Sequence, residues 1–260
     1  MQGGLKFIFL IVVIGLYAIL SSCATLSYYG QSIIGHLQIM GKKQPINNLL
    51  SAPGLPTQLR EKLIRTLEIR DFATNELRLP DNDSYRFYAN LARKYVVWNV
   101  IATPEFSLEP VEWCFLIVGC LPYRGYFSKK KAILFADKLR AKGYDVHIGG
   151  VTAYSTLGWF DDPVLNTMLQ HDKTHLAKVI FHELAHQKIY IKDDANFNEA
   201  FADSIALIGV RRWLDANSKA VELHQFEQSQ IRESAFIQLV IAYKSKLNQP
   251  YDKNIPDEEK

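Results

Sequence analysis

The sequence predicts an α+β domain in which helices surround a strand-rich middle, and three observations support this. Apolar residues recur at helical spacing before residue 77 and again after residue 178, whereas aromatic and β-branched residues dominate between residues 85 and 118. Of the 260 residues, 48% are hydrophobic, and we find no internal repeat or low-complexity tract. The chain can therefore bury one sizeable core with a small mixed sheet.

The N-terminal part of this domain is expected to be helical. Tyr28 to Met40 and Gln58 to Leu77 both show the apolar periodicity of helices. Pro56 and Thr57 are typical helix start signals for the second. We expect both helices to cover the core.

Strands and one helix are expected in the middle of the chain. Residues 85–118 predict short strands, and residues 129–142 predict a helix that Gly143 stops. Two further strands are expected at Tyr144 to Gly149 and at Val151 to Leu157.

Three helices are expected in the last part of the chain. They lie at Val179 to Ile191, at Phe197 to Leu214 and at Ala216 to Asn248. We expect the last of these to pack against the other two.

The first of these three helices carries an HExxH motif, formed by His182, Glu183 and His186. Two histidines four residues apart stand one turn from each other on a helix, so their imidazoles can converge on one metal ion. Glu183 then projects beside that ion, where its carboxylate can take a proton from an attacking water. The alternative is that both histidines lie on the surface of an amphipathic helix. The motif predicts a zinc peptidase site with Zn2+ as cofactor.

The segment NEAFAD, which opens the next helix, offers the third ligand that a catalytic zinc requires. Glu199 would face the metal, and Asp203, one turn further, would bond to the far nitrogen of a ligand histidine and fix its tautomer. Alternatively, Glu199 is an acidic residue favoured by the helix dipole. Only residues 187–198 separate His186 from Glu199, so the turn between the helices must be tight.

HExxH followed by NExxxD resembles the gluzincin branch of zinc peptidases. Three strings, CFLIVGCLPYRGYF, TAYSTLGWFDDP and FHELAHQKIYIKDDANFNEAFAD, resemble the bacterial predicted aminopeptidase family of lipoproteins. This resemblance covers most of the chain after residue 24 and implies a zinc-dependent peptidase with a zincin-like fold. It also implies His182, His186 and Glu199 as ligands. Because members of that family usually continue further, we expect either that the chain is shortened at its C-terminus or that this homologue lacks an element that covers the cleft.

The N-terminal segment indicates where the protein works. Lys6 precedes an apolar run, and the residues up to Cys23 resemble the lipobox of bacterial lipoproteins. Residues 1–22 are therefore expected to be a signal peptide, with lipidation of Cys23 and residues 23–260 as the peptidase domain. The alternative is an uncleaved membrane anchor, for which the apolar run is short. We expect the protein on the periplasmic face of the outer membrane, attached by its lipid.

Cys114 and Cys120 are the two cysteines that remain after Cys23. An even number of thiols in an exported protein predicts a disulfide between them, which would hold the turn that follows. Two free thiols in a strand are the alternative.

The charge of the chain argues against a nucleic-acid partner. The net charge is +3 with no concentrated basic patch. The expected partners are a peptide substrate and, through the anchor, the membrane.

Further site residues follow from the architecture of zincin folds, in which a strand before the metal helix binds the substrate by strand addition. In this chain Tyr154, Ser155 and Thr156 would line that cleft. Asp161 or Asp162 would hold a free N-terminal ammonium. Tyr190, four residues after His186, would stabilise the oxyanion if the helix extends that far.

The function expected from these observations is peptide-bond hydrolysis by metal-activated water at the cell envelope. The alternative is a non-catalytic peptide-binding or assembly lipoprotein that keeps a structural zinc.

Overall fold

The computed structural model describes residues 26–115, 119–192 and 194–251. They divide between two compact units, one ending at Gly41 and one beginning at Lys42. In the first unit, residues 26–40 form one helix, which confirms the helix expected from Tyr28 to Met40. The expected signal peptide and the lipidation site Cys23 lie outside the described residues. Within the described ranges, no helix is long and apolar enough to cross a membrane.

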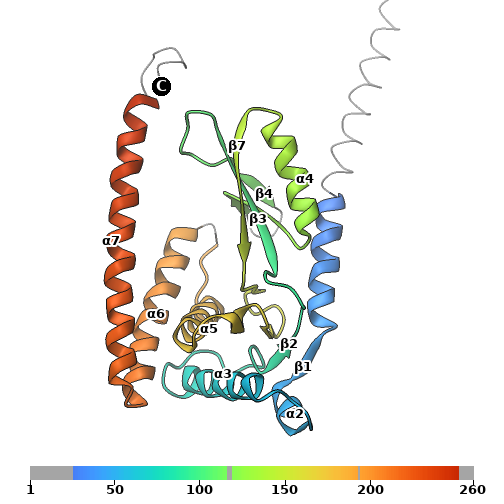
Figure 1. Cartoon of the computed structure of the whole chain (residues 1–260), viewed down its shortest axis with the longest axis vertical. Helices are drawn as coiled ribbons and strands as arrows, with labels where there is room; N and C mark the ends of the chain where they lie inside the picture. The colour runs from blue at the N-terminus through green and yellow to red at the C-terminus, as the bar shows by residue number, and fades with distance from the viewer. Residues whose placement is uncertain (1–25, 116–118, 193, 252–260) are drawn as a thin grey trace, which may run out of the picture. The chain divides into compact units, whose positions relative to one another are not determined.

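The second unit mixes helices and short strands, as expected for an α+β fold (Figure 1). Its elements are, in chain order, β1 (Lys43–Pro45), α2 (Ile46–Ser51), α3 (Thr57–Asn75), β2 (Phe87–Ala89), β3 (Val97–Pro104), β4 (Trp113–Phe115), β5 (Gly119–Leu121), β6 (Arg124–Tyr126), α4 (Lys129–Arg140), β7 (Tyr144–Val151), β8 (Val164–Leu165), the short 3-10 helix η1 (Met168–Gln170), α5 (Lys173–Lys188), α6 (Ala195–Ala216) and α7 (Ala220–Tyr251).

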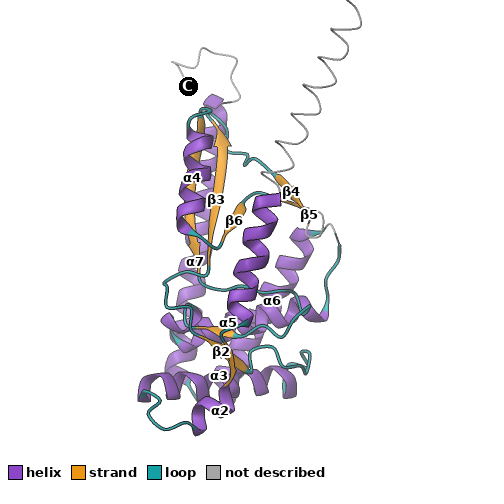
Figure 2. Ribbon diagram, turned by 90° about the vertical axis from the view of Figure 1, so that its right-hand side faces the viewer, coloured by secondary structure: helices purple, strands orange, loops and turns teal. Residues whose placement is uncertain are grey.

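The strands form three small sheets. In one, β2 pairs antiparallel with β1 and parallel with β8, so this sheet is mixed. In the second, β3 is central and pairs antiparallel with β6 and with all of β7. Helix α4 runs alongside this sheet (Figure 2) and buries Ala132, Ala136 and Leu139. Because β7 is an edge strand, one of its sides has no partner strand among the described residues.

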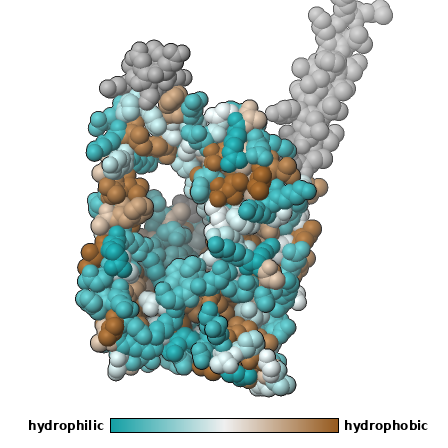
Figure 3. All heavy atoms as spheres, in the orientation of Figure 1, coloured by the Kyte–Doolittle hydropathy of each residue, from teal (hydrophilic) through white to brown (hydrophobic). Residues whose placement is uncertain are grey.

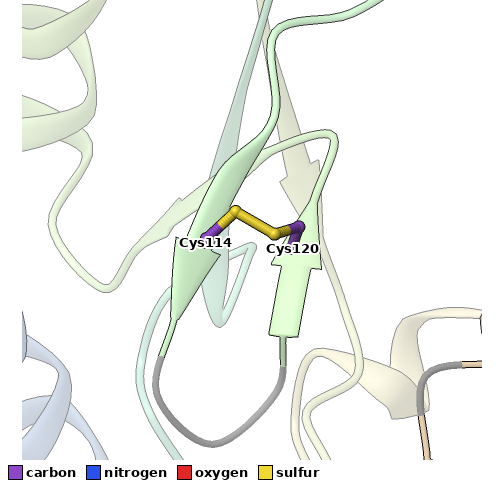
Figure 4. The surroundings of a disulfide bond; sticks show 2 residues. All are labelled: Cys114 and Cys120. Carbon is purple, nitrogen blue, oxygen red and sulfur yellow. A yellow bond between two sulfur atoms is a disulfide. The ribbon is translucent and has the colours of Figure 1, made fainter.

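The third sheet is the hairpin β4–β5, which a disulfide closes. Cys114 lies directly opposite Cys120, and the structure joins them (Figure 4). The cross-link ties the two strands together immediately before Tyr123.

Helices α3, α5, α6 and α7 form the helical part of the core. Phe181 of α5 is fully buried, and its ring centre lies 6.1 Å from that of Phe72 on α3. Gly209 lets α6 come close at this point, because a Cβ there would lie 2.7 Å from Leu77 and 2.8 Å from Phe181. A glycine is therefore required for the present spacing between α6 and the helix that carries HExxH.

Most of the helices and strands expected from the sequence are present, but the prediction of one strand is wrong. The strand expected from Val151 to Leu157 is absent, since β7 ends at Val151 and residues 152–156 have no regular structure. The physical reason is the carboxylate of Asp162, which accepts a hydrogen bond from the backbone N–H of Thr156 at 2.7 Å. This N–H is therefore not available to a neighbouring strand. Leu157 and Gly158 then turn the chain with positive φ angles of 55° and 83°.

Candidate metal centre

Helix α5 presents the HExxH motif because its opposite face is buried. The side chain of Asp172 caps the helix by accepting a hydrogen bond from the backbone N–H of His175 at 2.9 Å. Residues spaced three or four apart are then buried along one side, namely Leu176, Ala177, Ile180, Phe181, Leu184 and Ala185. This burial fixes the rotation of the helix and turns His182 toward α6.

The connection from α5 to α6 is held by Asn198. Its side-chain oxygen accepts from the N–H of Ile191 at 2.8 Å, and its amide donates to the carbonyl of Ile191 at 2.7 Å. Asn198 is 2% exposed, so these bonds are shielded from water. Asp194 caps α6 by accepting from Phe197 N–H at 3.0 Å. The tight turn that the sequence required is thus closed immediately before Glu199.

Three side chains from the two helices converge. The Nε2 atoms of His182 and His186 lie 3.0 Å apart. One carboxylate oxygen of Glu199 lies 3.3 Å from Nε2 of His182, and the other lies 3.6 Å from Nε2 of His186. Within the described part of the chain, this is the group of histidine and carboxylate side chains arranged to hold a metal ion. These separations suit atoms that each lie about 2 Å from one shared ion.

Asp203 determines which ring nitrogen of His182 carries the proton. Its Oδ1 lies 3.1 Å from Nδ1 of the imidazole, on the side away from Glu199. A carboxylate accepts a hydrogen bond there, so the proton of the neutral ring belongs on Nδ1. Nε2 of His182 then keeps its lone pair and directs it at the other two side chains.

The electrostatic environment suits a cation. Burial, and then the neighbouring His182, lower the pKa of His186, which keeps its imidazole neutral. Nδ1 of His186 is buried and makes no hydrogen bond to the described residues. Two ring nitrogens in such close contact need a shared proton or a cation between them. Since the Glu199 carboxylate also faces them, the donor set fits a divalent cation.

Glu183 lies beside this group in a more enclosed environment. Burial raises the pKa of its carboxyl, and His182 and a hydrogen bond from Ser155 oppose the rise. Asp162 and Glu199 add to the rise. A carboxylate with a raised pKa is a better proton acceptor near neutral pH than an ordinary glutamate.

A cavity of about 820 Å³ opens along α5, α6 and α7 beside the motif. His182, Glu183 and Asp203 line it, together with Phe226 on α7 and Ala153 after β7. A substrate in this cavity can reach His182, which is one of the candidate ligands, and Glu183.

Tyr190 lies near His186 but not on the helix of the motif, and its role in stabilising the oxyanion stays a prediction. Helix α5 ends at Lys188, so Tyr190 lies beyond the helix, 49% exposed, with its ring centre 6.3 Å from that of His186.

Tyr123 is a second tyrosine whose side chain interacts electrostatically with residues of the candidate site. Burial raises its pKa first, and then Glu199, Glu183 and Tyr190 do so, which means that these groups act on Tyr123 electrostatically. The sequence alone offers Tyr123 as an oxyanion donor only if the fold brings it to the motif.

The residues expected to bind substrate have other contacts. The hydroxyls of Ser155 and Thr156 donate to Asp162 at 3.3 and 3.0 Å. Tyr154 packs its ring against Phe127 at 5.4 Å. In this segment, Ala153 lines the cavity. Substrate binding by Tyr154, Ser155 and Thr156 stays a prediction. Their contacts with Asp162 and Phe127 stabilise the loop that follows β7.

Of the two aspartates expected to hold an ammonium, Asp162 is too buried to do so, and the role of the half-exposed Asp161 stays a prediction. Asp162 is fully buried, and Asp161 lies 3.8 Å from the Nζ atom of Lys43. Asp162 instead belongs to a buried polar group behind Glu183. This group includes the fully buried Tyr85, whose pKa is raised well above its ordinary value by burial and then by Glu183 and Asp162.

A family model described as Putative aminopeptidase matches residues 27–260. The match spans nearly the whole chain, so the chain belongs to this family. No curated protein and no solved structure matches it.

Proposed function

From this family membership we propose that the protein is a zinc-dependent aminopeptidase with a zincin-like fold, acting at the bacterial cell envelope. The convergence of His182, His186 and Glu199 is the observation that carries the proposal. Two imidazole nitrogens and a carboxylate form a donor set typical of catalytic zinc, with a fourth position left for water or substrate. The 63% exposure of the Glu199 side chain supports such an open position.

The chain's own residues supply the proton transfers. When bound, zinc would lower the pKa of water and polarise the scissile carbonyl. The carboxylate of Glu183 would accept the proton from the attacking water and deliver it to the leaving amine. Asp203 would hold Nδ1–H of His182 and keep its Nε2 directed at the metal.

The envelope location rests on the N-terminal segment and on the disulfide. Residues 1–22 and Cys23 resemble a lipoprotein signal, and the Cys114–Cys120 bond suits an oxidising compartment. We propose that lipidation of Cys23 anchors the protein to the outer membrane.

The test compares the purified parent with Glu183→Gln on peptides with free and with blocked N-termini. We expect turnover to fall at least a hundredfold in the variant with its zinc retained, because Glu183 is a base and not a ligand. We also expect blocked peptides to be poor substrates. Parent protein that contains zinc but cleaves no peptide would favour the non-catalytic alternative.

A further inference from the structure

Two segments that lie far apart in the sequence meet on the face of α5 that carries Glu183. Gln187 follows Glu183 by one helical turn, so the two side chains share this face. The side-chain oxygen of Gln187 accepts a hydrogen bond from Nδ2 of Asn82 at 2.8 Å, and its Nε2 donates to Oγ of Ser84 at 3.3 Å. The loop after β7 comes equally close at Gly158, where a Cβ would lie 3.1 Å from Cγ of Gln187. Both segments therefore pack beside Glu183.

The first of these segments holds Tyr85 in a backbone conformation that tyrosine rarely adopts. Its φ angle is 65°, in the left-handed region where a side chain of this size is uncommon. The backbone N–H of Tyr85 donates to the carbonyl oxygen of Asp162 at 2.7 Å. The fully buried Arg70 donates from Nε to the preceding carbonyl at 2.9 Å. Such a conformation persists only where the surroundings fix it, and it is typical of functional sites.

The hydroxyl of Tyr85 is the part of this arrangement that lacks a partner. It is buried and completes no hydrogen bond with the described residues. Burial, and then Glu183 and Asp162, raise the pKa of Tyr85 well above its ordinary value, and Ser155 opposes the rise. The phenol is therefore neutral, and its proton is available to a nearby acceptor. A buried donor without an acceptor is costly, so its presence in a native structure points to a role for the group.

The hydroxyl of Ser155 interacts with two carboxylates. Its oxygen accepts from the backbone N–H of Leu157 at 3.2 Å and lies 3.3 Å from Oδ2 of Asp162. Burial raises the pKa of Glu183, and His182 and a hydrogen bond from Ser155 oppose the rise. A hydroxyl has one proton, so it can serve only one of the two carboxylates at a time.

Asp162 has other donors and does not depend on this proton. It accepts from the backbone N–H of Thr156 at 2.7 Å and from the Thr156 hydroxyl at 3.0 Å. Its contact with Ser155, at 3.3 Å, is the longest of these. Glu183, by contrast, receives its side-chain hydrogen bond from Ser155. The proton of Ser155 is thus the one that can hold the carboxylate of Glu183.

We propose that Ser155 and Tyr85 are positioning residues for the carboxylate of Glu183. The inference rests on the proposed function, in which this carboxylate is the base. Ser155 donates its proton to one oxygen of Glu183. Tyr85 and the backbone N–H of Leu157 donate to the Ser155 oxygen, which fixes the direction of its own O–H. The other oxygen of Glu183 is left to face the cavity, where the molecular surface is hollowed beside α7 (Figure 3).

The kinetic test compares Tyr85→Phe and Ser155→Ala with the parent on a peptide that has a free N-terminus. Each variant removes one hydroxyl and leaves Glu183 and the three candidate ligands in place. We expect kcat to fall about tenfold in each, with KM and zinc content unchanged, because a positioning contact acts on the base and not on the substrate or the metal. A rise in KM with kcat unchanged in Ser155→Ala would overturn the inference and favour substrate binding by this residue.

Tyr88→Phe is the matched control. Tyr88 is 8% exposed, and burial raises its pKa without any effect of Glu183 or Asp162. Loss of its hydroxyl should leave kcat at the parent value. An equal fall of kcat in Tyr88→Phe and Tyr85→Phe would overturn the inference, because the loss would then follow from any buried hydroxyl.

A second measurement does not depend on turnover. Urea unfolding of the full chain gives the unfolding equilibrium constant for Ser155→Ala, for Glu183→Ala and for the two changes together. If the hydroxyl bonds to the carboxylate, the combined effect differs from the product of the single effects by about threefold or more. The pair Tyr88→Phe and Glu183→Ala should show no such coupling.

The two measurements separate this inference from the proposed function. Independent effects of Ser155→Ala and Glu183→Ala on unfolding would overturn the inference, even in a parent that cleaves peptides. A parent that cleaves no peptide, but in which Ser155 and Glu183 are coupled, would contradict the proposed function and leave the positioning contact supported.

Discussion

Nδ1 of His182 and Oδ1 of Asp203 lie 3.1 Å apart across the interface between α5 and α6. This contact decides which nitrogen of His182 carries the proton, and therefore which one is available to a metal. It also joins the helix of the HExxH motif to the helix that carries Glu199. The two helices thus share one candidate metal centre, and Asp203 joins them there without being one of the three candidate ligands.

Asp203→Ala is expected to weaken zinc binding about 10-fold to 100-fold, because His182 loses the partner that fixes its tautomer. The measurement is competition with a chromogenic chelator. Asp215→Ala, at an exposed position near the end of the same helix, is the control and should leave the affinity unchanged. Equal affinity in both variants would show that Asp203 does not support the site.

Asn198→Ala is expected to lower the free energy of unfolding by about 1 to 3 kcal/mol, because it leaves the N–H and the C=O of Ile191 without their partner. Urea unfolding measures the change. The exposed Asn196 in the same turn offers the control, and Asn196→Ala should have little effect on stability. Similar losses in the two variants would contradict the role of Asn198 in closing the turn.

Gly209→Ala is expected to destabilise the protein by about 1 to 3 kcal/mol, since the added methyl would overlap Leu77 and Phe181. Thermal unfolding would show this as a lower Tm. The same change at Gly30, in the helix over residues 26–40, meets no atom within 4 Å and should leave the Tm equal or higher. A neutral Gly209→Ala would mean that α6 can shift away from α5.

Asp162 should make stability depend on pH. Burial raises the pKa of its carboxyl from 3.8 to about 6. A carboxyl whose pKa is higher in the folded state favours folding when protonated, below pH 3.8, and this contribution is lost as the pH rises through about 6. The difference of roughly two pH units corresponds to about 3 kcal/mol.

Asp162→Asn removes this ionisation and keeps an oxygen that can accept from Thr156 N–H. Relative to the parent, we expect the variant to gain stability between pH 4 and pH 8, by at most about 3 kcal/mol. Urea unfolding at several pH values measures the difference. A constant difference across this range would show that Asp162 has the same pKa in the folded and unfolded states.

The helices and the convergence of the motif residues could be predicted from the sequence because both depend on local spacing. HExxH places its histidines one turn apart on any helix, and the apolar periodicity of residues 173–188 fixes which face is buried. The short connection also required a tight turn. The sequence did not reveal that Asn198 closes it, since a buried asparagine looks like any polar residue near a helix start.

The errors arose where distant residues determine local structure. Residues 152–156 have strand-like composition, but Asp162 takes the backbone N–H of Thr156 and prevents pairing. Glu199 and Glu183 contribute to the raised pKa of Tyr123, although Tyr123 is far from both in the sequence. No local pattern encodes such placements, because they depend on how the elements pack.

The most direct test of the central proposal is the zinc content of the purified full chain, measured by elemental mass spectrometry beside that of Glu199→Ala. We expect about one zinc per parent chain and little or none in the variant, with both proteins folded. A folded parent without zinc, or a variant that keeps a full equivalent, would contradict the assignment of His182, His186 and Glu199 as the metal ligands.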